Sequence, residues 1–425
     1  MNVNDTNNTK KKLNRQWELL DQADISDRDK EAITDFVRIE RQGNQNREPN
    51  TLYSDLSSLR NAAVRADTSL VEMDLTGFRT LISTLTSPKS QGGYGLDPNG
   101  GGIYNYKRAL RIFFQWLDRQ PDFPDFEFYD SIDITSQSVS RVNEDKMLDD
   151  DDIEKLKQHA KNPRDPAIIE FLADTGARVS MASQLRIKDI HDLDTQRPYF
   201  TPNPNGNGHK GAPDKRYPIL QSRAEIRNWV NQYHPDPRPE APLWPILRGY
   251  DRDSPQECAL SNDRLRDALR ACGRRAGIEK PVNPHNFRHS AITRLSRQGY
   301  TPQQIQHIAG WASDRMLEAY DHTTDRQRNE GMRVKAGFID ESETEDGPTQ
   351  PKTCGNCRET LKATAQFCPR CGAPTTKETE EAISEQDDRI VESAAMADGE
   401  LASAVLELRR LVEDSPELRR RLLDV

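Results

Sequence analysis

Apolar residues recur every three or four positions through the first 125 residues, and this spacing predicts a series of α-helices. Four stripes carry the pattern: Ile33, Phe36 and Val37; Leu52, Leu56, Leu59 and Ala63; Phe78, Leu81, Ile82 and Leu85; Ile103, Tyr106, Leu110, Phe113, Phe114 and Leu117. Four or five helices of this kind suit a compact helical domain, which we assign to residues 1–135. We expect the stripes to form its core.

A second unit, assigned to residues 146–338, mixes helical and strand patterns. Residues 121–143 before it are rich in acidic residues, Ser and Thr, which predicts an extended linker. Asp165 and Pro166 are typical of a helix start, with Asp as the cap and Pro in the first turn. Tyr199–Thr201 and Arg216–Ile219 predict two strands joined by a turn with two Asn-Gly steps. The chain is therefore expected to be mostly α, of the α+β class, with a small antiparallel sheet.

Charge is distributed unevenly along the chain. The formal net charge is −9, and residues 341–425 hold 19 acidic and 11 basic residues, so −8 of it lies there and −1 in the first 340 residues. Residues 280–335 hold nine Lys or Arg, five Asp or Glu and four His. This stretch is locally basic, as phosphate binding requires, although the whole chain is acidic.

The sequence contains no run of about 18 apolar residues, which argues against a membrane span. The first dozen residues are polar and have no apolar segment of the kind that secretory signals carry. We therefore expect a cytoplasmic protein.

Two arginine motifs and one tyrosine carry the candidate chemistry. Thr175-Gly176-Ala177-Arg178 comes first, His285-Asn286-Phe287-Arg288 follows about a hundred residues later, and Gly310-Trp311 precedes Tyr320. Arginine stays charged at physiological pH and matches phosphate oxygens with a planar set of donors. Tyrosine can form a covalent intermediate once its proton is removed. Together these groups predict cleavage and rejoining of a phosphodiester without a metal ion.

The order and spacing of these motifs resemble the tyrosine recombinase (phage integrase) family. The resemblance covers residues 147–335 by motif, and the helical region before them is similar in position to the family's core-binding domain. It implies that Tyr320 attacks the scissile phosphate and forms a 3′-phosphotyrosyl link. It further implies that Arg178 and Arg288 hold the non-bridging oxygens and that His285 assists proton movement.

Three positions need separate comment within that resemblance. Trp311 stands where many relatives have histidine, and its indole N–H can donate to phosphate but cannot act as a base. The general acid for the 5′-hydroxyl is expected to be a lysine on the hairpin. We prefer Lys210, which lies eight residues before Pro218 as in the family pattern, and Lys215 is the competitor. Met181 stands where relatives often have a glutamate. In those relatives the glutamate is expected to support the first arginine.

Four cysteines follow in residues 351–376, at a spacing typical of a zinc ribbon. Cys354 and Cys357 form one Cys-x-x-Cys pair, and Cys368 and Cys371 form the other, ten residues further on. Four thiolates at this spacing fit tetrahedral zinc and leave no open position, so the metal would be structural. Disulfides are the alternative, but a cytoplasmic chain keeps its thiols reduced. Residues 378–425 are highly charged, with a helical pattern.

The motifs and the resemblance together predict a site-specific DNA recombinase or integrase. We expect it to contain structural zinc and to use no nucleotide or catalytic metal. The implied partners are double-stranded DNA and other copies of the chain, as a homotetramer on DNA and a monomer free in solution. Lys107, Arg108 and Arg111 are candidates for DNA backbone contact, although a solvated helix face explains them equally well. The zinc ribbon is expected to contact either DNA or, with a slight preference, a protein. The alternatives are a non-catalytic DNA-binding regulator on the same fold and a tyrosine-type topoisomerase.

Overall fold

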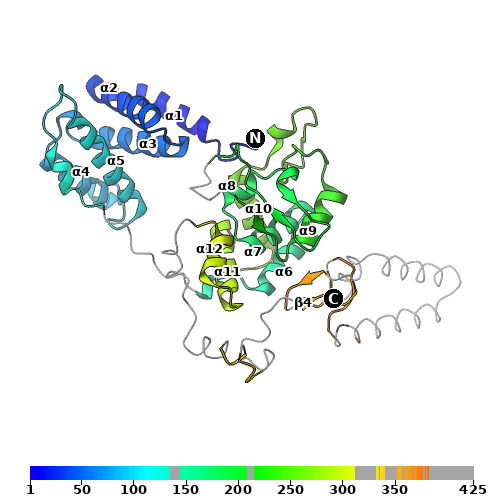
Figure 1. Ribbon diagram of the computed structural model, residues 1–425. Helices are drawn as coiled ribbons and strands as arrows, with labels where there is room; N and C mark the ends of the chain where they lie inside the picture. Colours follow the sequence, from blue (N-terminus) through cyan, green and yellow to red (C-terminus); the bar gives the residue numbers. More distant parts are fainter. Residues whose placement is uncertain are drawn as a thin grey trace. The chain divides into compact units, whose positions relative to one another are not determined.

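The computed structural model describes residues 1–134, 144–207 and 215–311, and shorter stretches at 332–334, 336–339, 352–356, 359–363, 365–368, 370–376, 379 and 381. The chain divides into two compact units (Figure 1). One comprises Met1–Arg141 with Asn205–Lys210, and the other comprises Val142–Pro204 with Gly211–Val425. Both are mostly helical with small antiparallel sheets in the second, which confirms the predicted fold class.

The first unit is built from helices, as the apolar stripes predict. Its elements are α1 (Thr9–Asp21), α2 (Asp27–Asp35), the π-helical η1 (Phe36–Asn44), α3 (Pro49–Arg65), η2 (Leu70–Glu72), α4 (Leu75–Thr86), η3 (Lys89–Gln91), α5 (Gly101–Leu117) and η4 (Glu127–Ser131). Every stripe residue is buried except Ile82, which is partly buried. Helix α3 packs between α1 and α5 and so holds the bundle together.

The segment after α5 belongs to this bundle. Phe126 is fully buried and stacks on Phe114 with ring centroids 5.4 Å apart. Ile132 is also buried, just after η4. The prediction of an extended linker from residue 121 is therefore wrong for its first part, because the acidic composition there hides two residues that extend the core.

Arg108, one of the candidates for DNA contact, pairs with a buried carboxylate of the same bundle. Asp55 is fully buried on α3, and its two oxygens accept from Arg41 Nε at 2.8 Å and from Arg108 Nη2 at 2.7 Å. Arg111 pairs weakly with Asp130 at 3.5 Å. The structure therefore gives Arg108 a role inside the bundle, where it compensates a buried charge.

The second unit contains the candidate motifs. Its elements are η5 (Glu144–Lys146), α6 (Asp150–Gln158), α7 (Arg164–Thr175), α8 (Val179–Ser183), η6 (Ile187–Asp189), β1 (Ile190–His191), β2 (Tyr199–Phe200), β3 (Tyr217–Pro218), α9 (Arg223–Asn228), the π-helical η7 (Trp229–Tyr233), η8 (Pro255–Cys258), α10 (Asn262–Arg275), α11 (Pro284–Arg297), α12 (Pro302–Ala309), β4 (Lys352–Thr353) and β5 (Thr360–Leu361). No helix among the described residues is both long and apolar enough to cross a lipid bilayer.

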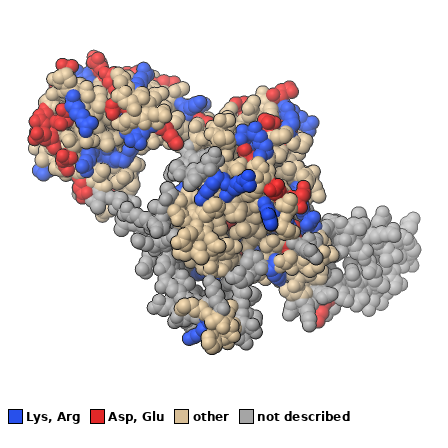
Figure 2. Space-filling model, in the orientation of Figure 1, with Lys and Arg blue, Asp and Glu red and all other residues tan. Residues whose placement is uncertain are grey.

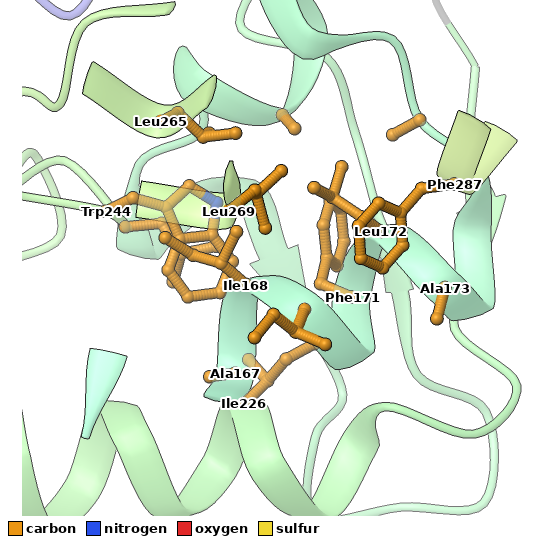
Figure 3. Packing of buried hydrophobic residues seen from close by; sticks show 14 of the residues in the cluster. Ala167, Ile168, Phe171, Leu172, Ala173, Ile226, Trp244, Leu265, Leu269 and Phe287 are labelled. Carbon is orange, nitrogen blue, oxygen red and sulfur yellow. The ribbon is translucent and has the colours of Figure 1, made fainter. Parts of the chain in front are cut away.

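Helix α7 is the central element of this unit. Its side chains are buried on every face, and Figure 3 shows them among residues from other parts of the chain, including Trp244 from a loop, Leu269 of α10 and Phe287 of α11. The helix begins at Arg164 with Pro163 at the cap, so the prediction that Asp165 caps it is wrong. The Asp165 carboxylate instead accepts from Arg164 and Asn162, each at 2.7 Å.

A three-stranded antiparallel sheet lies against α7. The two predicted strands are present as β2 and β3, with Phe200 paired to Tyr217, and β1 adds a third strand that the sequence pattern does not predict. Phe200 of β2 meets Phe171 of α7 edge to face, with ring centroids 5.2 Å apart. The sheet is thereby held to the central helix through its aromatic face.

Candidate active site

Helix α7 ends in a glycine that the packing requires. Gly176 has φ 57°, in the left-handed region that favours glycine, and it ends the helix two residues before Arg178. A Cβ atom at Gly176 would lie 3.2 Å from Cβ of Ala291 and 3.6 Å from Cα of Arg288. The absence of a side chain therefore lets the first arginine motif approach α11, which carries the second.

The two arginines converge on one short turn. Arg178 donates from Nη1 to the carbonyl of Gly310 at 3.2 Å, and Arg288 donates from Nη2 to the carbonyl of Ala309 at 2.7 Å. Arg288 also donates from Nη1 to the carbonyl of Gly176 at 2.9 Å, and its residue is buried. Main-chain carbonyls thus fix two permanent positive charges close together, although the residues lie 110 positions apart in the sequence.

The turn that receives these arginines is itself tightly packed. Gly310 ends α12 with φ 62°, and a Cβ atom there would lie 2.9 Å from the hydroxyl oxygen of Tyr217 on β3. Trp311 follows and is buried, with its ring centroid 5.4 Å from Cζ of Arg288. Cation–π attraction of this kind keeps the guanidinium and the indole together. The predicted donation from the indole to phosphate stays a prediction.

His285 lies in the first turn of α11, one helical turn before His289. The Nε2 atoms of the two imidazoles are 2.7 Å apart, and their ring centroids are 4.0 Å apart. At this distance one imidazole can donate a hydrogen bond to the other, an arrangement that suits proton transfer.

Of the two candidate lysines, the structure describes Lys215. Its ammonium nitrogen lies 5.4 Å from the ring centroid of Tyr217, the same ring that packs on Gly310. Burial lowers the pKa of Lys215, which makes it a better proton donor near neutral pH. Lys210 lies outside the described residues, and so does Tyr320.

Sequence reasoning missed one carboxylate next to the first arginine motif. Asp174 is buried at the end of α7, and its Oδ2 accepts from the backbone N–H groups of Leu220, Gln221 and Ser222 at 3.0, 2.9 and 2.9 Å. It ties the end of α7 to the loop after β3. The available signal was an acidic residue directly after the apolar run that ends at Ala173.

Three of the four cysteines are described, and they form a cluster. The Sγ atoms of Cys354, Cys368 and Cys371 lie within 4.8 Å of one another. Cys354 Sγ and Cys371 Sγ are 3.7 Å apart. A disulfide needs about 2.05 Å, whereas two sulfurs bound at about 2.3 Å to one tetrahedral zinc lie about 3.8 Å apart. Cys357 falls outside the described residues. The donor set fits zinc.

The surface around these motifs carries both signs of charge. Figure 2 shows Lys and Arg side chains on the visible face of the second unit, with acidic side chains among them. A nucleic-acid contact would therefore depend on local cations rather than on a uniformly basic face.

The family model for the phage integrase family matches residues 146–327. This stretch contains both arginine motifs, Trp311 and Tyr320, and it is similar to the domain that defines that family. Members of the family catalyse the cleavage and rejoining of DNA.

Curated relatives are similar to this chain in sequence, and solved structures are similar to it in fold. The chain is 27% identical over 227 residues to tyrosine recombinase XerD of Listeria innocua, covering 52% of this chain and 71% of the relative. It is 30% identical over 190 residues to tyrosine recombinase XerA of Pyrococcus furiosus, covering 44% and 60%. Among solved structures, the Tn1549 transposon integrase in complex with transposon right end DNA has a TM-score of 0.50 at 17% identity, covering 72% of this chain and 99% of that chain. A lambda integrase dimer bound to a core site has a TM-score of 0.50 at 15% identity, covering 69% and 78%. These two structures show the shared fold.

Proposed function

We propose that this protein is a site-specific recombinase that cuts and rejoins duplex DNA through a covalent phosphotyrosine intermediate. The observation that carries the proposal is the convergence of Arg178 and Arg288 on the carbonyls of Ala309 and Gly310. Cations fixed before the substrate arrives are what a phosphoryl-transfer transition state requires, because no reorganisation is needed as charge develops. The phage integrase domain at residues 146–327 supports the same chemistry.

In the proposed reaction, the phenolic oxygen of Tyr320 attacks the scissile phosphorus. The tyrosine O–P bond forms as the bond from phosphorus to the 5′-oxygen breaks, and the two arginines stabilise the charge on the non-bridging oxygens. The phenolic proton leaves with the help of His285, and a hairpin lysine protonates the departing 5′-oxygen. Because the phosphotyrosyl link keeps the bond energy, a different 5′-hydroxyl can reverse the step without a nucleotide or a catalytic metal.

The partner class follows from this chemistry. The relatives with solved structures include a lambda integrase dimer on a core site and the Tn1549 integrase on transposon end DNA. For this chain we propose double-stranded DNA as the substrate, with four protomers assembled on two sites and a monomer in solution. A DNA substrate agrees with the cytoplasmic location that the sequence predicts.

The proposal is tested with a nicked suicide substrate, from which the short fragment that carries the new 5′-hydroxyl diffuses away, so that the covalent intermediate accumulates. We expect protein covalently linked to a DNA 3′ end, and mass spectrometry of the linked peptide should identify Tyr320. The Tyr320→Phe variant should bind the same DNA and give no adduct. Adducts at normal yield from this variant would overturn the assignment of the nucleophile.

Two rivals are separated by further outcomes. A non-catalytic regulator would bind DNA and give no adduct with the wild-type chain on any site. A tyrosine-type topoisomerase would relax a plasmid with one site or none, whereas a recombinase requires two sites and yields exchanged products. Recombination between two sites on one plasmid is the expected result.

A further inference from the structure

The cysteine cluster sits in a small module that has little apolar core of its own. Strands β4 and β5 form an antiparallel hairpin, and the buried apolar groups around it are Cys354, Leu361 and Cys368, packed against small neighbours. Backbone bonds place the ligand positions, with Cys354 N–H donating to the carbonyl of Glu359 at 2.8 Å. A fold this small requires a metal or disulfides to be stable, and the 3.7 Å sulfur separation favours the metal.

The hairpin makes buried ion pairs with the phage integrase domain. Glu359, one residue before β5, is 1% exposed and accepts from Nε of Arg223 at 2.6 Å. Arg223 is the first residue of α9, and its side chain is 4% exposed. Removing two charges from water to this degree is costly unless each compensates the other. The contact is therefore specific to this pair of surfaces.

A second ion pair reaches the central helix. Lys362, one residue after β5, places its ammonium nitrogen 2.9 Å from Oε1 of Glu170, which is 2% exposed on α7. Lys157 contacts Glu170 at 3.0 Å and Glu225 at 3.0 Å. Burial alone would raise the pKa of Glu170, but the ammonium groups of Lys157 and Lys362 hold it well below its usual range. The hairpin thus supplies one of the two cations that keep this buried carboxylate charged.

We propose that the cluster of Cys354, Cys368 and Cys371 binds one zinc ion and that zinc binding makes the module an internal clamp on the phage integrase domain. The ion fixes the hairpin, the hairpin presents Glu359 and Lys362, and these residues hold α9 and α7. Helix α7 ends five residues after Glu170 and leads directly into Arg178. Zinc binding is therefore expected to reduce the local opening of α7, the helix that positions the first arginine. The sequence favours a protein contact for this module, and the contact we propose is within the chain.

The test uses the full chain and measures zinc content, thermal unfolding and hydrogen exchange of the α7 and α9 peptides. We expect one zinc per chain. Removing it with a chelator should lower Tm by roughly 5 °C or more and speed exchange in both helices, and adding zinc back should reverse both effects. The Cys368→Ser variant should behave like the zinc-free protein.

A second pair of variants separates the clamp from the metal site. Glu359→Gln should keep its zinc and still show faster exchange in α9, and the exchanged pair Arg223→Glu with Glu359→Arg should recover part of the protection. Lys352→Gln is the matched control, because it removes a charge from the same hairpin and Lys352 forms no ion pair among the described residues. This variant should change hydrogen exchange in neither helix.

Two results would overturn the proposal. One is a chain that binds no zinc and whose cysteines are shown by mass spectrometry to be free thiols or disulfides. The other is a zinc-free or Glu359→Gln protein whose α7 and α9 exchange as slowly as in the wild type. These readouts do not require DNA cleavage, so the clamp and the recombinase function are tested independently.

Discussion

The most informative residues of this protein are two arginines, whose permanent charges are held in place by main-chain carbonyls. Arg178 and Arg288 donate to neighbouring carbonyls of a single turn, so backbone atoms help to fix both guanidinium groups. Because arginine does not titrate in the working range, this part of the site should be insensitive to pH. Any pH dependence must come from the histidine pair, the tyrosine or the lysine.

Replacing Arg288 by alanine tests the electrostatic role. We expect the rate of covalent complex formation to fall by roughly 10²–10³, as is typical for the loss of one donor to a developing charge. Single-turnover cleavage on saturating suicide substrate measures this. The side chain is buried and bonded to two carbonyls, so unfolding must be followed in parallel. A rate that stays within a factor of two in a folded variant would exclude the assigned role.

The identity of the general acid is decided by the leaving group. A substrate with sulfur in place of the bridging 5′-oxygen expels a thiolate, which needs no proton donor because thiols are far more acidic than alcohols. Methionine at the true general acid should slow cleavage of the oxygen substrate strongly and leave the sulfur substrate nearly unaffected. Lys210→Met and Lys215→Met serve as each other's control, and only one of them should show this pattern.

The pH profile gives an independent check on Lys215. A general acid acts in its protonated form, so the rate should fall as pH rises through its pKa. Burial lowers the pKa of Lys215 below its ordinary value of 10.5, so the alkaline decline should begin at correspondingly lower pH. If Lys215 is the acid, the sulfur substrate should lack this decline. A decline of equal size on both substrates would assign it to another group.

At the level of elements, the site depends on how closely helix ends approach one another. Gly176 allows α7 to approach α11, and Gly310 allows α12 to approach β3. Asp174 holds the end of α7 to the loop after β3. These contacts join segments far apart in the sequence, so helix termini and turns position the candidate catalytic arginines.

Gly310→Ala tests this arrangement. Its left-handed backbone costs an L residue about 1–2 kcal/mol, and the new Cβ would displace the Tyr217 hydroxyl 2.9 Å away. Shifting the turn that anchors both arginines should slow cleavage about tenfold or more. Adding Tyr217→Phe should recover part of the rate. Gly277→Ala, also left-handed but with open space around it, should cost similar stability and leave the cleavage rate unchanged.

The sequence predicts some of these features well and others poorly, for physical reasons. Helices with one apolar stripe were predicted correctly because burial on one face imposes a period on the sequence. Helix α7 is buried on all sides and has no single apolar stripe, so its start was misplaced by the Asp165-Pro166 pair. Phe126 was hidden among acidic residues, and Asp174 acts through contacts that no local pattern encodes. The arginine motifs were predictable because chemistry limits which residues can serve there.

Across the whole chain, most of the net negative charge falls in a stretch of sequence that does not contain the motifs. Residues 341–425 carry −8 of the net −9, while the segment from 280 to 335 is locally basic. Affinity for DNA must then come from a limited number of phosphate contacts, partly offset by repulsion from the acidic end. Such a balance limits non-specific binding and leaves discrimination to contacts with the target site.

Deleting residues 383–425 tests this balance while keeping the cysteine module. The deletion removes 11 acidic and 6 basic residues, a net of −5. We expect tighter binding to non-specific DNA at low salt, because long-range repulsion is lost, and a smaller difference above about 0.15 M, where the screening length is about 8 Å. The slope of log K against log salt near physiological salt should change little, because it counts phosphates contacted rather than net charge. Fluorescence anisotropy across a salt series measures both quantities. A large loss of slope on deletion would instead mean that the basic residues of this segment contact DNA directly.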